Sequence, residues 1–174
     1  SLAAASLRGG EPAKEMATEP RDTIQKMHRH FSADCFNTCW TFINKPELSA
    51  KDREKMLLLA HASLWHWKQR TDCTPVNLSI GYWQVSRVYE IAGNYELARV
   101  FGQKCLDISE GATLGPFLVG YAHEALARAE VVHEDFGAAK IHLAEAEKLL
   151  SRVTDKEEKS FLAADIADLK KRIP

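Results

Sequence analysis

From residue 22 onward, apolar side chains recur every three or four positions, and no long stretch alternates apolar with polar residues. This period predicts amphipathic α-helices and argues against strands. Helix-starting residues stand between the periodic segments, at Ser49, Thr74-Pro75, Asn94, Gly115-Pro116 and Thr154. We therefore expect about seven helices, near residues 22–43, 49–70, 75–93, 94–111, 116–132, 136–153 and 154–173.

Two of these helices carry more specific expectations. The first presents one apolar stripe, made of Ile24, Met27, Phe31, Cys35, Thr38 and Phe42, which we expect to face the core. The last opens with Thr154 and Glu157, the Ser/Thr-x-x-Glu spacing of a capping box. We interpret it as a polar-faced helix that closes one end of the fold.

The connections between the helices are short, so consecutive helices should pack as antiparallel hairpins. The predicted fold is all-α, with hairpins stacked in chain order as a short right-handed α-solenoid and a C-terminal capping helix. Residues 21–174 form one domain in this interpretation, because a chain of this length can bury a core without a metal or a disulfide. Residues 1–20 lack an apolar period, and we expect a disordered tail or an added leader, with Met16-Ala17-Thr18 as a plausible native start.

Two segments of the chain repeat each other. Residues 91–98 and 132–139 share a turn, an aromatic residue after it (Tyr95, Phe136) and an alanine three positions later, and 136 − 95 gives a period of 41. This pattern resembles the tetratricopeptide repeat, whose usual period is about 34. The first copy departs from the repeat at Gly102, and the second has Glu134 in place of the turn glycine.

A wider resemblance covers nearly the whole chain from residue 22. The strings at 61–67, 74–77, 83–89 and 124–129 are similar to those of a family of small uncharacterised bacterial repeat proteins. The resemblance implies the same helical fold and a bacterial setting, and it implies no activity.

The likeness to tetratricopeptide repeats implies that the first helix of each pair lines a concave face. Mapped onto this chain, each repeat places an aromatic ring, an arginine and a carboxylate there: Ile80, Trp83, Arg87 and Glu90 in one, and Tyr121, Glu124, Arg128 and Val131 in the next.

These residues suggest a groove in which Arg87 and Arg128 bind a carboxylate while Trp83 and Tyr121 supply apolar contact. The alternative is an ion pair between Arg87 and Glu124 that ties adjacent helices together without any ligand. The sequence leaves both open.

The net charge limits which partners the protein can bind, and the cysteines indicate its compartment. The chain has 23 Lys and Arg against 24 Asp and Glu, a net charge of −1, so we expect neither nucleic acid nor a membrane surface as partner. No apolar run approaches the roughly 18 residues of a membrane span. Four cysteines without a CxxC pair fit a reducing compartment, and we expect a cytoplasmic protein.

Candidate chemistry is sparse. Cys35 and Cys39 share a helix face and could meet His61 or His66 at a metal, but two buried thiols explain the pair more simply. We expect no metal and no cofactor, and we find no nucleophile motif or phosphate loop. His61 also stands beside the unusual Trp65-His66-Trp67 cluster, where it could serve a pocket.

We therefore predict a binding or adaptor module, and not a catalyst, that recognises a peptide, a protein tail or a small anionic ligand in a polar groove of mixed charge. Two alternatives stay open. One is an enzyme or sensor with a pocket built on His61, Trp83, Arg87 and Glu124. The other is a scaffold that associates with itself as a homodimer.

Overall fold

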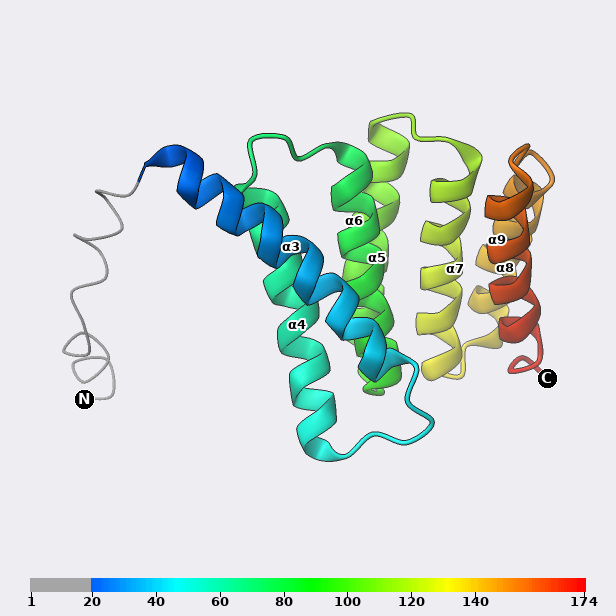
Figure 1. The fold of residues 1–174 in the computed structure, drawn as a ribbon. Helices are drawn as coiled ribbons and strands as arrows, with labels where there is room; N and C mark the ends of the chain where they lie inside the picture. The colour runs from blue at the N-terminus through cyan, green and yellow to red at the C-terminus, as the bar shows by residue number, and fades with distance from the viewer. Residues whose placement is uncertain (1–19) are drawn as a thin grey trace.

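The computed structural model describes residues 20–174, which form seven helices and no strand (Figure 1). The helices are α3 (Arg21–Ile43), α4 (Ala50–Gln69), α5 (Pro75–Ile91), α6 (Tyr95–Gly111), α7 (Pro116–Val132), α8 (Phe136–Leu150) and α9 (Lys156–Lys170). The predicted all-α class and number of helices are confirmed for this part of the chain. The expected tail lies, apart from Pro20, outside the described residues.

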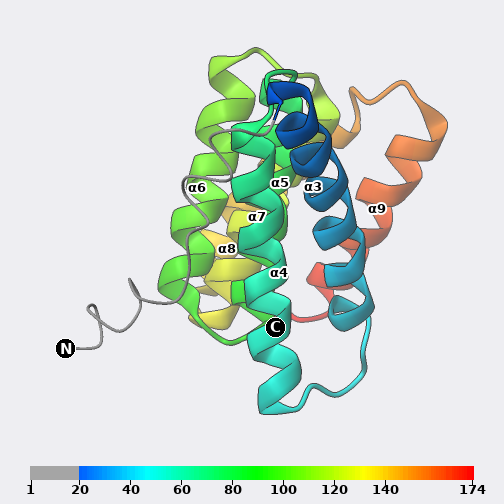
Figure 2. The ribbon, with the colours of Figure 1, turned by 60° about the vertical axis from the view of Figure 1, so that its left-hand side comes forward.

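Consecutive helices pack as hairpins: α3 with α4, α5 with α6, and α7 with α8 (Figures 1 and 2). The hairpins stack in chain order as a short α-solenoid, because α5 contacts α7 and α6 contacts α7. The last helix, α9, packs on α7 and α8 and closes the stack, as the sequence predicts. One layer, called the inner layer below, therefore consists of α3, α5, α7 and α9.

The helix starts follow from local chemistry. Ser49 accepts the backbone N–H of Asp52, whose side chain accepts the N–H of Ser49, which is a complete capping box. Thr74 and Asn77 form the same reciprocal pair at the start of α5.

The cap of α9 differs from the prediction by one residue. Asp155, and not Thr154, accepts the backbone N–H groups of Glu157 and Glu158 at 3.0 and 2.9 Å. A carboxylate can accept two N–H groups at the positive end of the helix dipole, which favours Asp155 over the neighbouring hydroxyl.

The core consists of two apolar clusters that meet at α7. The first joins α3 to α7 around Met56, Val85, Val88 and Leu126, and the second joins α7, α8 and α9. Leu143, Leu162 and Leu169 are among the buried residues of the second cluster. The capping helix is therefore part of the core.

The apolar stripe expected on the first helix is wrong in part. Met27 and Phe31 are 49% and 37% exposed, whereas Ser32 and Cys39 are the buried residues of α3. Ser63 on α4 donates to the backbone oxygen of Ser32 at 2.8 Å. Small side chains at this interface let α3 and α4 approach closely and turn the larger side chains of α3 outward.

The turns that follow α5 and α7 share one backbone geometry. Gly93 and Glu134 both have positive φ, 76° and 61°, and both turns close with an N–H to carbonyl bond of the next residue: Asn94 to Tyr89 at 2.9 Å and Asp135 to Glu130 at 3.0 Å. A glutamate in this region costs about 1–2 kcal/mol more than glycine. The second repeat therefore keeps the turn geometry although it lacks the glycine.

Gly102, where the sequence departs from the repeat pattern, lies where α6 and α7 approach. A Cβ at this position would stand 3.1 Å from Leu126 Cδ2 and 3.3 Å from Ser86 Oγ. The close packing of α7 thus explains why a large residue is absent here.

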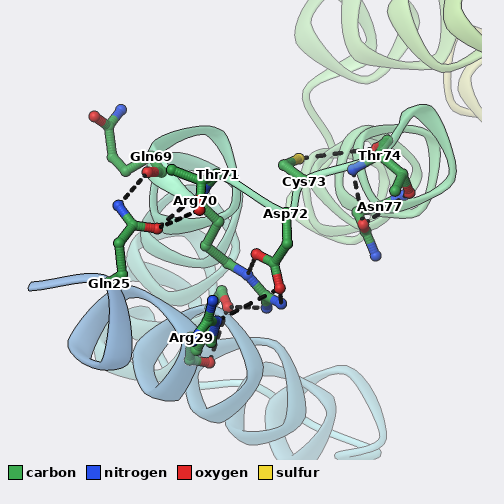
Figure 3. Close-up of polar contacts among 10 residues, drawn as sticks. Gln25, Arg29, Gln69, Arg70, Thr71, Asp72, Cys73, Thr74 and Asn77 are labelled. Atoms are coloured by element: carbon green, nitrogen blue, oxygen red, sulfur yellow. Dashed lines mark hydrogen bonds and ion pairs between the residues drawn. The ribbon is translucent and has the colours of Figure 1, made fainter. Parts of the chain in front are cut away.

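The loop between α4 and α5 is fixed by a polar network with α3 (Figure 3). Arg70 binds Asp72 through two parallel bonds of 2.9 Å and donates to Ser32 Oγ at 3.0 Å. The hydrogen bonds from the Arg70 side chain lower the pKa of Asp72 to about 2. Gln25 contributes two further bonds to the backbone of this loop. The network therefore holds this loop against α3.

Within residues 20–174, no helix combines the length and apolarity that crossing a membrane requires.

Candidate functional site

A hollow of about 430 Å³ opens on the inner layer, and eleven residues from five helices line it. Its floor comes from α5 and α7, with one residue of α6, and its walls come from α3 and α9, which are well separated in Figure 1. The lining residues are Trp40, Ser79, Ile80, Trp83, Cys105, Phe117, Leu118, Tyr121, Phe161, Ala164 and Asp165. We call this the aromatic hollow.

Aromatic rings form a continuous wall around it. Trp40 and Trp83 lie tilted with ring centroids 5.7 Å apart, Trp83 meets Tyr121 edge-on at 5.4 Å, and Tyr121 meets Phe117 edge-on at 5.0 Å. Tilted and edge-on contacts of this kind are favourable and hold the rings in place. The side chains that surround the hollow therefore restrain one another before any ligand is present.

The polar groups of the hollow are few and already bonded. The Tyr121 hydroxyl donates to Asp165 Oδ2 at 2.8 Å, and burial together with the Asp165 charge raises the pKa of Tyr121. At the floor, Ser79 and Ser109 share a hydrogen bond of 2.8 Å. Burial raises the pKa of the Cys105 thiol to about 11. At neutral pH both the phenol and the thiol are neutral, and the thiol is a weak nucleophile.

A buried ion pair lies next to the hollow on α7. Arg128 is 2% exposed and Glu124 is fully buried, and the guanidinium donates directly to the carboxylate. The Trp83 indole N–H also donates to Glu124, at 3.1 Å. Burial raises the pKa of Glu124, and the two donors act in the opposite direction by favouring the charged form.

The same guanidinium reaches α9. Its Nη2 lies 3.5 Å from Asp165 and its Nη1 lies 3.8 Å from Asp168. The Nη1 atom is buried and makes no hydrogen bond within the described residues. Arg128 therefore joins α7 to the capping helix through the two carboxylates of α9.

The predicted equivalence of the two arginines is wrong. Arg87 is half-buried and donates to Glu90 on its own helix, and Glu90 also accepts from Arg172 Nη2 at 2.7 Å. Arg128 is enclosed because α9 packs over it, whereas Arg87 has no such cover. The alternative of an Arg87–Glu124 ion pair is also not formed, because each residue pairs along its own helix.

The structure does not bring His61 to the other predicted site residues. His61 lies between α4, α5 and α6, where its Nε2 is 2.9 Å from the Tyr89 hydroxyl and its ring meets Phe101 edge-on. Burial lowers its pKa. Of the four residues proposed for an alternative pocket, the aromatic hollow includes Trp83 alone.

Sequence reasoning missed eight of the eleven residues that line the hollow, including Trp40, Phe117, Phe161 and Asp165. Trp40 directly follows the buried Cys39, and Phe161 directly precedes the buried Leu162, which places both rings beside the core face of their helices. An aromatic residue at such a boundary position was the available signal. Aromatic rings, and not the mixed charges expected from the sequence, thus make up most of the wall of the hollow.

Histidines pair across two hairpins. His28 and His66 have Nδ1 atoms 2.8 Å apart between α3 and α4, and His123 and His142 have Nδ1 atoms 3.2 Å apart between α7 and α8. Within residues 20–174, no three or more His, Cys, Asp or Glu side chains are grouped to hold a metal ion. The buried Cys39 thiol donates to the Met56 carbonyl oxygen at 3.4 Å.

Comparisons of the chain with protein-family models, with curated proteins and with solved structures give no match. The resemblance to tetratricopeptide-like bacterial proteins therefore stays a prediction, and the site rests on its own geometry.

The two arginines should differ in their effect on stability. Arg128→Gln leaves the buried Glu124 without its cation and should lower the free energy of unfolding by about 3–5 kcal/mol. Arg87→Gln should cost about 1 kcal/mol or less, because Glu90 keeps Arg172. The double variant Glu124→Gln/Arg128→Met removes both charges and should recover most of the loss. Urea unfolding of the four proteins measures this, and equal costs for the two single variants would contradict the assignment.

The histidine pair of α7 and α8 should make stability depend on pH. Burial and then the charge of His142 lower the pKa of His123; Lys148 adds to this shift, and Glu110 and Glu145 oppose it. Burial also lowers the pKa of His142, where Arg99 adds to the shift and Glu130 opposes it. Because both folded-state pKa values lie below the ordinary value of about 6.5, the unfolded chain binds more protons as the pH falls through that value.

The free energy of unfolding should therefore decrease from about pH 7.5 to about pH 5.5, and the decrease should be smaller in His142→Gln. His30→Gln is the control, since His30 is exposed on α3 and contacts the Phe31 ring. Denaturant titrations at a series of pH values test this. A pH dependence in His142→Gln as steep as in the wild type would rule out the pair as its source.

Proposed function

We propose that the protein is a non-catalytic binding module that takes a segment of a partner polypeptide along its inner layer. The observation that carries this proposal is the aromatic hollow, which is built by four helices of the inner layer and one residue of α6. Its volume of about 430 Å³ lies within the range of ligand-binding pockets. Its rings are also held in place by one another, which lowers the entropy lost on binding.

A second, smaller hollow supports a polypeptide over a single compact ligand. It has a volume of about 270 Å³, lies between α3, α4 and α5, and shares Ile80 with the aromatic hollow. The rings of Phe36 and Trp40, one from each hollow, are 6.3 Å apart. In an extended segment, side chains two positions apart are separated by roughly 7 Å. Two adjoining hollows therefore suit two side chains of one segment.

The chemistry of the hollow supports binding without catalysis. Its thiol and its phenol are neutral at pH 7, and the Ser79 hydroxyl is bonded to Ser109 and not to a base. A nucleophile needs a lowered pKa or an adjacent general base. Neither condition is met by the Ser79 hydroxyl or the Cys105 thiol.

The proposed ligand is not anionic, which departs from the expectation drawn from the sequence. Both arginines of the predicted groove are bonded to carboxylates of the chain itself. An anion would also meet Asp165 at the wall of the hollow. Self-association, by contrast, stays a prediction from the sequence.

We keep the cytoplasm as the proposed location. All four cysteines, Cys35, Cys39, Cys73 and Cys105, are free thiols in the structure, which suits a reducing compartment.

Selection from a phage library of random 12-residue peptides tests the proposal on the full chain. Peptides selected on the wild-type protein should bind it with dissociation constants below about 100 μM when measured by calorimetry. Ala164→Trp should weaken them by at least about tenfold, because Ala164 lines the hollow and a large side chain there would fill it.

Ala167→Trp is the matched control. Ala167 is exposed on the same helix, one turn further along, and does not line the hollow, so its replacement should leave the affinity unchanged. Selected peptides that bind Ala164→Trp as tightly as the wild type would occupy another surface and would overturn the proposal. A selection that yields no binding peptide would do the same.

A further inference from the structure

Five aromatic rings from four helices surround the aromatic hollow: Trp40 of α3, Trp83 of α5, Phe117 and Tyr121 of α7, and Phe161 of α9. Phe161 is 55% exposed, so it stands at the open side of the hollow. The face of an aromatic ring carries partial negative charge and attracts cations. A cation that enters this hollow could contact several ring faces at once.

The charged side chain of the lining is negative, like the faces of the rings. Among the described residues that line the hollow, none is Lys, Arg or His, and Asp165 is the one that carries a full charge at neutral pH. Its side chain is 42% exposed, so it remains accessible to a ligand. The Tyr121 hydroxyl bonds Oδ2 and fixes the carboxylate in position.

The nearby Arg128 does not cancel this negative charge. Its guanidinium donates directly to Glu124 and reaches Asp165 only at 3.5 Å and Asp168 only at 3.8 Å. Glu124 is therefore the closest partner of this guanidinium, and the two carboxylates of α9 lie further from it. Arg128 does not itself line the hollow.

Outside the hollow, three aromatic rings of residues 20–174, those of Phe42, Trp67 and Tyr82, have a Lys or Arg over them. Lys68 and Lys104 lie over the Tyr82 ring at 5.6 and 5.9 Å, and Arg70 lies over Trp67 at 3.8 Å. In residues 20–174, no Lys or Arg stands over any of the five rings of the aromatic hollow. The largest group of rings in the inner layer is therefore without a cation from the chain.

We propose that the aromatic hollow takes a positively charged side chain, lysine, methylated lysine or arginine, from the partner segment. The aliphatic stem would pack against the rings, and the ammonium or guanidinium group would lie between the ring faces and the Asp165 carboxylate. A neutral apolar side chain would instead remove water from that carboxylate without replacing its partner, which is unfavourable. This inference rests on the proposed function and adds the chemical class of the bound residue.

Two small molecules of the same shape, one charged and one neutral, distinguish the contribution of charge to binding from that of apolar contact. Benzyltrimethylammonium carries a quaternary nitrogen where neopentylbenzene carries a quaternary carbon. Each is titrated into the full chain while the indole N–H signals of Trp40 and Trp83 are followed by NMR, with assignments from Trp40→Phe and Trp83→Phe. We expect the cation to bind at least about tenfold more tightly than the hydrocarbon.

Asp165→Asn is the decisive variant, because the amide keeps the size of the side chain and an acceptor for Tyr121 while it removes the charge. It should reduce the preference for the cation to about threefold or less. Asp168→Asn is the matched control: it removes the other carboxylate of α9 near Arg128, but Asp168 does not line the hollow, so the preference should stay. Thermal melts confirm that both variants are folded.

A second arm uses the selected peptides. Replacing their Lys or Arg residues one at a time by norleucine keeps the stem and removes the charge. One such change should weaken binding to the wild type by about tenfold and binding to Asp165→Asn by much less.

The outcomes distinguish this inference from the proposed function. If both probes bind equally, or if neither binds while Ala164→Trp still weakens the binding of the selected peptides, the cationic ligand is wrong and the polypeptide-binding module stands. If neither probes nor peptides bind, both proposals fail. A preference for the cation that survives in Asp165→Asn would also overturn the assigned role of this carboxylate.

Discussion

The ion pair between Arg128 and Glu124 is the constraint on which the rest of the site depends. A guanidinium that is 2% exposed is stable only if carboxylates surround it, and α7 supplies one while α9 supplies two more. This requirement fixes α9 against α7. It also brings Phe161 and Asp165 of α9 to the wall of the aromatic hollow. The capping helix therefore completes a binding surface as well as the core.

The inner layer separates two kinds of chemistry along its helices. The aromatic hollow lies toward the N-terminal halves of α5, α7 and α9, and the ionic cluster around Arg128 and Glu90 lies toward their C-terminal halves. Two hydrogen bonds link them, from the Trp83 indole to Glu124 and from Tyr121 to Asp165. The polar cluster thereby orients the rings, and the hollow is formed before a ligand arrives.

The sequence predicted the helices well because their signals are local. Ser49 and Thr74 form the caps expected of them, and the turns at Gly93 and Glu134 match although only one has a glycine. The site was predicted less well because its partners come from other helices. The likeness to tetratricopeptide repeats implied a concave face for Arg128, but only the docking of α9 decides that this side chain is enclosed rather than open.

Chemical modification of arginine in the native protein tests this account most directly. Phenylglyoxal reacts with accessible guanidinium groups, and mass spectrometry of the digested protein reports the modified fraction at each position over time. We predict that the exposed Arg152 reacts readily while Arg128 stays unmodified until the protein is unfolded. Modification of Arg128 in the folded protein at a rate close to that of Arg152 would contradict the account.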